Sequence, residues 1–260
     1  MWVGQQLADG LDFWGFLGSL ILGGIILGIY TGLLGYVGAK TGLSLDLLSQ
    51  RAFGEKGSYL PSAMTSFTQI GWFGVGSFVS GGTATPNFAR FAKNGKSGAI
   101  TTVVAFFIGN SLMFFFGAVS SIFVGGNDIF EVMVRLNLFY LAVLVLGLNI
   151  WTTNDNALYT AGLGLANIFH QRKKPMVLLS GIIGTVASVW LYYNFCGWLN
   201  ILNCTLPPVG MILVLAYFMN KEDFETDQPK LKTIDWFAVA GVILGAIVAN
   251  LLHWGIASIN

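Results

Sequence analysis

Charged residues are scarce in this 260-residue chain: they make up 10% of it, whereas hydrophobic residues make up 55%. A soluble domain carries about 25% charged residues, which it needs to cover its surface. With so few charges, a water-soluble fold would leave most of its exterior apolar. The composition therefore argues against a soluble enzyme or binding domain and indicates a polytopic helical membrane protein.

Several chemical signatures are also missing. The two cysteines, Cys196 and Cys204, form no CxxC motif and have no histidine pair nearby, so neither a disulfide framework nor a zinc site is indicated. A net charge of +1 leaves no basic stripe for a phosphate backbone, so we expect no nucleic-acid partner. There is no GxSxG, HExxH or Walker motif and no catalytic carboxylate pair, so we predict no enzyme activity and no cofactor.

Long apolar windows are the main positive signal. Each reaches the ~20 residues that cross about 30 Å of hydrocarbon, and none alternates as a barrel strand does. Backbone groups in lipid must be satisfied internally, so these windows predict helices. They run over Leu11 to Val37, Ala99 to Val124, Leu136 to Phe169, Met176 to Phe195, Leu199 to Met219 and Trp236 to Ile259. The predicted fold class is an all-α polytopic membrane protein.

Lysines and arginines gather in four of the loops between these windows. By the positive-inside rule, all four loops are expected on the cytoplasmic side, and the remaining connections, which carry few cations, on the other. The four clusters are Lys40, Arg51 and Lys56; Arg90, Lys93 and Lys96; Arg172, Lys173 and Lys174; and Lys221, Lys230 and Lys232.

The segment from Tyr59 to Thr85 breaks this alternation, because a basic loop flanks it on both sides. A single crossing would place the second basic cluster outside, so the segment is re-entrant, contributes halves of two helices, or violates the rule. Its centre, TQIGWFGVGSFVSGGT, holds five glycines, which weaken a helix but permit close packing or a broken helix along a cavity. Packing alone is one explanation. A ligand site is favoured by the residues Gln69, Trp72, Ser77, Phe78 and Ser80.

A second polar stretch, GLNIWTTNDNALY, lies within the third long window. Its residues Asn149, Thr152, Thr153 and Asn156 share one helix face. Such a row of amide and hydroxyl oxygens suits a neutral polar ligand or a weakly bound monovalent cation, although hydrogen bonding between helices is the alternative. Asp155 is offset from the row, and we interpret it as structural, with a proton relay as the alternative.

Six runs in the chain resemble the bacterial cytosine permeases of the nucleobase:cation symporter family. They are LGIYTGLLGYVGAKTGLS, TQIGWFGVG, NFARFAKN, FFIGNSLMFFFGA, GLNIWTTNDNALY and GIIGTVASVWLYYNF. The resemblance covers nearly the whole chain and implies a leucine-transporter-like bundle of two inverted five-helix repeats. It further implies a secondary active transporter in the bacterial inner membrane that imports cytosine with sodium by alternating access. A proton as the coupling ion, and a related nucleobase or hydantoin-like ring as the substrate, are the alternatives.

Compared with that family, the chain has segments missing. Residues 1–76 resemble family helices one to three and residues 77–260 resemble helices six to eleven, within a single transporter domain. Between Gly76 and Ser77 the family has the rest of helix three, helices four and five, and half of helix six. Half of helix one and the twelfth helix are also missing. A non-transporting truncated remnant is therefore an alternative function.

The resemblance also implies the binding residues. A nucleobase would stack between Trp72 and Phe78, and sodium would be bound by the hydroxyls of Thr152 and Thr153. Hydrogen bonds to the nucleobase would come from Gln69, Ser77, Ser80 and Asn149, the last of which also lies near the sodium. The expected partners are cytosine, sodium and the lipid bilayer, and the protein is expected to be a monomer.

Overall fold

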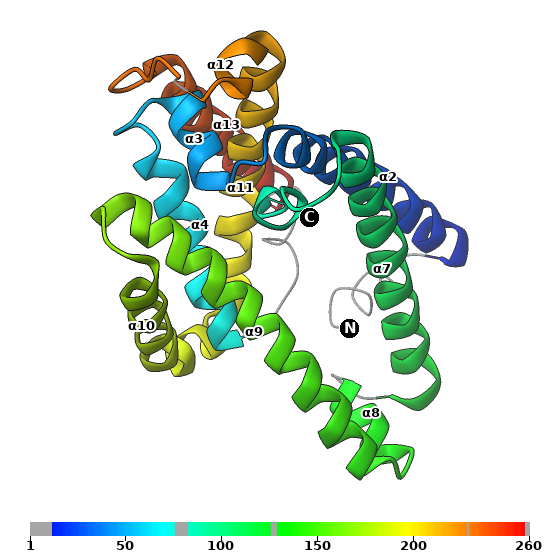
Figure 1. Ribbon diagram of the computed structural model, residues 1–260. Helices are drawn as coiled ribbons and strands as arrows, with labels where there is room; N and C mark the ends of the chain where they lie inside the picture. Colours follow the sequence, from blue (N-terminus) through cyan, green and yellow to red (C-terminus); the bar gives the residue numbers. More distant parts are fainter. Residues whose placement is uncertain (1–11, 76–82, 126–128, 228, 258–260) are drawn as a thin grey trace.

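The computed structural model describes residues 12–75, 83–125, 129–227 and 229–257, and within these ranges the regular elements are all helices (Figure 1). Six long helices coincide with the six apolar windows, which confirms those predictions. They are α2 (Phe13–Thr41), α7 (Gly95–Val124), α9 (Phe139–Phe169), α10 (Lys173–Tyr193), α11 (Phe195–Met219) and α13 (Trp236–Ala257). The other helices are α3 (Leu45–Phe53), α4 (Tyr59–Val75), α6 (Pro86–Ala89), α8 (Ile129–Arg135) and α12 (Lys221–Glu225).

Length and apolarity mark several of these helices as membrane spans. In the described part of the chain, four helical stretches meet both criteria: Phe13–Thr41, Gly95–Val124, Lys173–Leu191 and Gly197–Met219. α9 has 31 residues, but the polar stretch around Asn149 to Asn156 interrupts its apolar run. Large apolar side chains face outward from the helices, as in α13, where Phe237 is 92% exposed. Such a surface is suited to lipid rather than to water.

The ends of α2 show how local sequence sets a helix boundary. The Asp12 side chain accepts a hydrogen bond from the backbone N–H of Gly15 at 3.0 Å, which satisfies one of the free donors at the helix start. At the other end Gly42 adopts a φ of 69°, a left-handed conformation that glycine tolerates best. Its N–H closes the helix by donating to the carbonyl of Gly38.

α2 and α7 run side by side in contact (Figure 1). Glycines allow the two backbones to approach. A Cβ added to Gly98 of α7 would lie 2.4 Å from the Cβ of Ala39 and 2.8 Å from the carbonyl oxygen of Gly35. Small residues at such a contact are the usual means by which helices associate in lipid, where no hydrophobic force drives them together.

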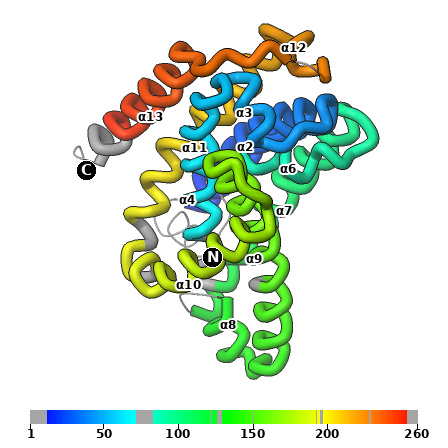
Figure 2. Tube along the Cα trace, turned by 60° about the vertical axis from the view of Figure 1, so that its left-hand side comes forward, coloured from blue at the N-terminus to red at the C-terminus, as the bar shows by residue number. Residues whose placement is uncertain are grey.

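A second packed group consists of α4, α9 and α10. Ser66 of α4 donates a hydrogen bond to the carbonyl of Ala161 in α9 at 3.2 Å, and Gly164 leaves room for the Ser66 hydroxyl. α11 runs alongside α13 on another side of the molecule (Figure 2). α2, α3, α11 and α13 meet in a buried core whose side chains include Leu34, Leu48, Phe53, Leu213, Tyr217 and Val242.

The order of the helices repeats once along the chain. A long helix, a short helix and a further long helix follow one another as α2, α3 and α4, and again as α7, α8 and α9. Corresponding long helices pack together, α2 on α7 and α4 on α9. The short helices α3 and α8 lie at opposite ends of the molecule (Figure 1). Two inverted repeats would have this arrangement, although the leucine-transporter fold itself stays a prediction.

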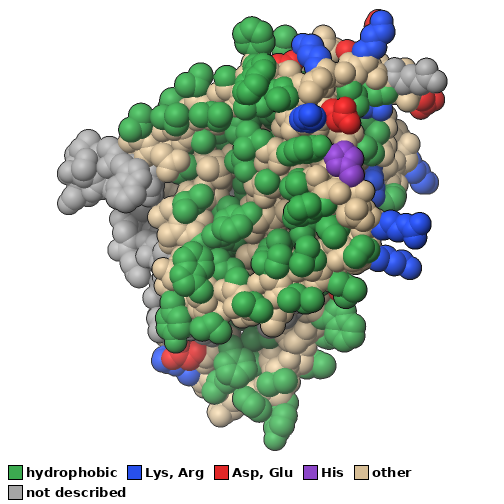
Figure 3. Space-filling model, turned by 90° about the vertical axis from the view of Figure 1, so that its left-hand side faces the viewer, with side chains coloured by type: hydrophobic (Ala, Val, Ile, Leu, Met, Phe, Trp, Pro, Cys, Tyr) green, Lys and Arg blue, Asp and Glu red, His purple; other side chains and the backbone are tan. Residues whose placement is uncertain are grey.

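Contacts join the four basic clusters at one end of the molecule. The first and fourth clusters meet where Lys40 lies 3.7 Å from Glu225, a residue between Lys221 and Lys230. The second and third clusters meet at Tyr159: its hydroxyl accepts a hydrogen bond from Arg90, and its ring centre lies 3.4 Å from the Lys173 ammonium. α3 connects the two groups through contacts with α6, α9 and α12. Figure 3 shows most lysine and arginine side chains along the upper and right-hand edges of one face. This gathering is what the positive-inside rule predicts.

The segment from Tyr59 to Thr85 starts and ends at this same basic end. Ser58, just before α4, accepts a hydrogen bond from Asn167 near the end of α9 at 3.1 Å. Asn87, in α6, accepts one from the backbone N–H of Leu45 at the start of α3 at 2.8 Å. The chain therefore leaves the basic end through α4 and returns to it by α6, so a single crossing is excluded, as the charge pattern predicted.

Asp46 of α3 is buried at this end, with 6% of its surface exposed, and accepts a hydrogen bond from Ser62 of α4 at 2.6 Å. Burial is the largest influence and raises the pKa of this carboxyl to about 6. Because the folded-state pKa is above the unfolded value, the stability that this group contributes is complete below the unfolded pKa of 3.8 and is lost as the pH rises through about 6.

We therefore expect Asp46→Asn to raise the melting temperature in detergent at pH 7.5 and to flatten its decline between pH 4 and pH 7. Asparagine keeps the acceptor for the Ser62 hydroxyl without the charge. The free energy of unfolding should rise by about 1–3 kcal/mol at pH 7.5. Asp235→Asn is the control with the opposite sign, because hydrogen bonding to Lys232 lowers the pKa of Asp235. Equal pH profiles for wild type and Asp46→Asn would contradict the assignment.

Candidate substrate cleft

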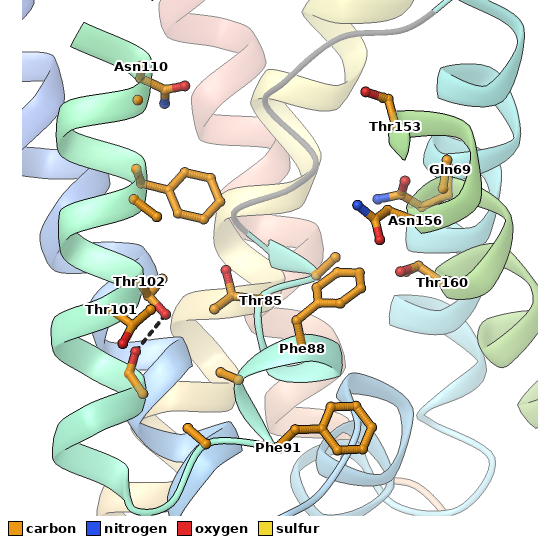
Figure 4. Close-up of a pocket in the computed structure, with 18 residues that line it drawn as sticks. Gln69, Thr85, Phe88, Phe91, Thr101, Thr102, Asn110, Thr153, Asn156 and Thr160 are labelled. Atoms are coloured by element: carbon orange, nitrogen blue, oxygen red, sulfur yellow. Dashed lines mark hydrogen bonds between the residues drawn. The ribbon is translucent and has the colours of Figure 1, made fainter. Parts of the chain in front are cut away.

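A cleft of about 770 Å³ opens between α7 on one side and α4 with α9 on the other, and α6 closes one end of it (Figure 4). A site of this size is large enough for a small heteroaromatic ring together with water. Its walls are mainly apolar, with threonines and amides at intervals. That mixture is typical of sites in which apolar walls provide contact and a few polar groups set the orientation of the ligand.

One wall carries polar residues from α4 and α9. Gln69 of α4 is buried, and its amide lies beside the Asn156 amide of α9 (Figure 4). Thr153 and Thr160 lie on either side of Asn156 along α9, at positions that share one helix face. This wall therefore presents two amides and two hydroxyls to the same space.

The opposite wall and the closed end belong to α7 and α6. Asn110 of α7 is 8% exposed and is the amide of this wall. Thr102 lies eight residues before Asn110 in α7 and also lines the cleft. Its hydroxyl donates a hydrogen bond to the carbonyl of Gly98 at 2.7 Å. Thr85 and Phe88 line the closed end, and the Phe88 ring is 42% exposed. An exposed ring at the end of a cleft offers a surface on which a flat ligand can stack.

The structure brings together some of the residues predicted for the site. Gln69 and Thr153 both line the cleft. Asn149 and Thr152 lie nearer the start of α9 than Thr153. Their side chains are exposed and do not line the cleft. The Thr152 hydroxyl donates to the backbone carbonyls of Leu148 and Asn149, at 3.2 and 3.0 Å.

The remaining predicted residues have side chains outside the described part of the structure. Trp72 belongs to α4, three residues after Gln69, but its side chain is not described. Ser77, Phe78 and Ser80 lie outside the described residues altogether. Their roles stay predictions.

Asp155 is exposed on α9 and does not line the cleft. It accepts a hydrogen bond from the indole N–H of Trp151, one turn earlier, at 3.1 Å. A carboxylate held by a neighbour on its own helix is consistent with a structural role.

Several cleft residues were not singled out as binding residues by the sequence. Asn110 is the one amide in the apolar window from Ala99 to Val124, and an isolated amide within a span is a signal that could have identified it. Thr160 continues the polar row of α9 by one further turn. Phe88 gave no periodic signal, because α6 is only four residues long.

Comparison with known proteins identifies the family. The sequence model for permeases for cytosine/purines, uracil, thiamine and allantoin matches residues 1–84 and 74–258. The chain belongs to this family. It is 36% identical over 353 residues to the cytosine permease of Escherichia coli strain K12, covering 100% of this chain and 84% of that protein. It is also 34% identical over 82 residues to the allantoin permease of Bacillus subtilis strain 168, covering 32% of this chain and 16% of that protein.

Membership of this family makes the chain a multi-pass membrane protein related to transporters rather than enzymes. For a bacterial permease this location is the inner membrane. The alignment with the K12 permease extends over 353 positions, and subtracting the 260 residues of this chain leaves 93 without a counterpart. The two family matches overlap at residues 74–84, around Gly76 and Ser77. Compared with this relative, the chain thus lacks an internal segment, as the resemblance implied.

Proposed function

We propose that this protein binds cytosine in the cleft between α4, α7 and α9 and imports it together with a cation by alternating access. The observation that carries the proposal is the convergence of Gln69 and Asn156 on one cleft, in a chain that belongs to a nucleobase permease family. Cytosine has an amine donor beside ring and carbonyl acceptors, and an amide side chain presents a donor and an acceptor together.

Trp72 and Phe78 are proposed to hold the ring of the substrate between them. Trp72 follows Gln69 by three residues in α4, which is a rise of about 4.5 Å along the helix. A planar heteroaromatic ring gains contact area and a fixed orientation by stacking on an indole. Ser77, Ser80 and Asn149 are proposed to complete the hydrogen bonds.

Sodium is the proposed coupling ion, held by Thr152 and Thr153 with Asn149 nearby. The Thr152 proton points to the backbone, so the lone pairs of its oxygen are available to a cation. Among the described residues there is no group of three or more histidines, cysteines and acids that could hold a metal ion. Hydroxyl and carbonyl oxygens bind monovalent cations weakly enough for release, which a transport cycle requires.

This proposal predicts that Thr152→Ala removes most of the tightening of cytosine binding by sodium. Affinity measured without sodium and with 100 mM sodium should differ by about tenfold in the wild type and by less than twofold in the variant. Thr152→Ser keeps the hydroxyl and is the matched control. Affinity that ignores sodium but changes with pH would favour a proton as the coupling ion.

Uptake of radiolabelled cytosine by cells that lack their own permease tests transport itself. Uptake above the empty-vector level, blocked by unlabelled cytosine, is the expected result. A competition panel with uracil, allantoin, hydantoins and thiamine distinguishes cytosine from a related substrate. Saturable binding to the purified protein without uptake would identify a truncated remnant that retains the site but does not transport.

A further inference from the structure

We propose that Arg90, Lys173 and the N-terminal turn of α10 form a binding site for the phosphate of an anionic phospholipid headgroup. This site lies at the basic end of the molecule and is separate from the polar wall of the cleft. It does not depend on which substrate the cleft binds.

Two cations from different loops share one tyrosine. Arg90 follows α6 and donates a hydrogen bond to the hydroxyl of Tyr159 in α9. Lys173 is the first residue of α10, and its ammonium lies 3.4 Å from the centre of the same ring. The two positive charges are therefore held within a side chain's length of each other, where they repel. An anion bound between them would turn this repulsion into attraction.

No acid of the described residues is paired with either cation. The ion pairs in the described ranges join Lys40 to Glu225, Arg135 to Glu131 and Lys232 to Asp235. Asp46 interacts electrostatically with Arg90 but is in none of these pairs, and its carboxylate accepts a hydrogen bond from Ser62.

One donor of Arg90 has no partner among the residues that the structure describes. Its Nε is buried and makes no hydrogen bond to the described residues. A buried donor without a partner costs about 1–3 kcal/mol, so such groups in native proteins usually have a ligand, a water molecule or another protein group beside them. A phosphate oxygen would satisfy this N–H and the positive charge together.

The start of α10 adds further donors. Arg172 occupies the N-cap position, but no side chain caps this 21-residue helix. Pro175 has no N–H, so the donors that the first turn offers are the backbone N–H groups of Lys173 and Lys174, which lie at the positive end of the helix dipole. Free N–H groups at a helix start, a lysine and an arginine form a combination that suits phosphate.

Exposed aromatic side chains beside this site favour a lipid over free phosphate. Phe91 is 74% exposed, and its ring lies 4.7 Å from the guanidinium carbon of Arg90. Phe169, at the end of α9 and four residues before Lys173, is 55% exposed. α10 is itself a candidate membrane span, which places its first turn near headgroup depth. Basic pockets between spans on the cytoplasmic side bind anionic headgroups in this way, while apolar side chains contact the acyl chains.

Native mass spectrometry of the purified full chain with added lipids tests this site. We expect phosphatidylglycerol to be retained at least tenfold better than phosphatidylcholine. The double variant Arg90→Gln with Lys173→Gln should lose this preference. The control variant Lys40→Gln with Lys232→Gln removes the same number of charges from acid-paired lysines and should keep it.

Two further measurements complete the test. If the double variant does not fold, Lys173→Gln alone must lower phosphatidylglycerol retention several-fold, because its contact with Tyr159 is a cation–π interaction of modest strength. Millimolar inorganic phosphate identifies the source of the anion: if it stabilises the wild type but not the variant, without a lipid preference, the site binds free phosphate. Equal retention of both lipids with no effect of phosphate would overturn the proposal.

Discussion

Trp72→Ala is expected to weaken cytosine binding about 30-fold or more while the purified protein stays folded. Stacking of a base on an aromatic side chain contributes roughly 1–3 kcal/mol by alanine substitution. The loss of apolar contact around the ring adds to this, and each 1.4 kcal/mol corresponds to about a tenfold change in affinity. Titration calorimetry with cytosine measures the effect directly.

Phe67→Ala provides the matched control on the same helix. Phe67 is 54% exposed, packs edge-on against Trp198 and does not line the cleft. Its removal should change cytosine affinity less than threefold. Trp72→Phe keeps a stacking ring and should fall between the wild type and the alanine variant. An unchanged affinity in Trp72→Ala would show that the substrate does not stack on α4.

Gly98→Leu is expected to prevent folding of most of the expressed protein. A Cβ at this position would lie 2.4 Å from the Cβ of Ala39 and 2.8 Å from the backbone oxygen of Gly35. The second of these is a backbone atom, so α2 and α7 must separate to make room for a side chain. Overpacking typically costs about 1–3 kcal/mol and more where the backbone must move, which is a large fraction of a protein's net stability.

Gly109→Leu in the same helix is the control, because within the described ranges no atom apart from the adjoining backbone of α7 lies within 4 Å of a Cβ added there. Both variants introduce the same side chain into α7, so they differ only in what surrounds it. The yield of monodisperse protein in size-exclusion chromatography and the melting temperature in detergent report the outcome. Equal yields and melting temperatures for the two variants would contradict the α2–α7 contact.

The positions of the long helices could be predicted because the bilayer requires about 20 apolar residues in each span. The exact residues at which these helices start could not be predicted. α7 begins at Gly95, four residues before the predicted window, because the polar turn Gly95 to Gly98 forms helix without contributing to hydropathy. Charge placement predicted that residues 59–85 begin and end at one side, and hydrogen bonds at Ser58 and Asn87 confirm it.

The candidate cleft was only partly predictable. The polar face of α9 follows from helical periodicity, but periodicity does not tell which part of that face another helix covers. In the structure Thr153 and Asn156 line the cleft, while Asn149 and Thr152 lie beyond it. Gln69 was singled out by the polar and aromatic residues of the glycine-rich stretch and again by the family resemblance. Asn110 and Phe88 depend on how α6 and α7 pack against α9, which is a long-range property that local patterns do not contain.

The most direct test of the account is equilibrium binding of radiolabelled cytosine to the purified 260-residue protein in detergent. The account predicts saturable binding that unlabelled cytosine displaces and that Gln69→Ala reduces at least tenfold. Absence of saturable binding of cytosine by the folded wild-type protein, or equal binding by Gln69→Ala, would contradict it.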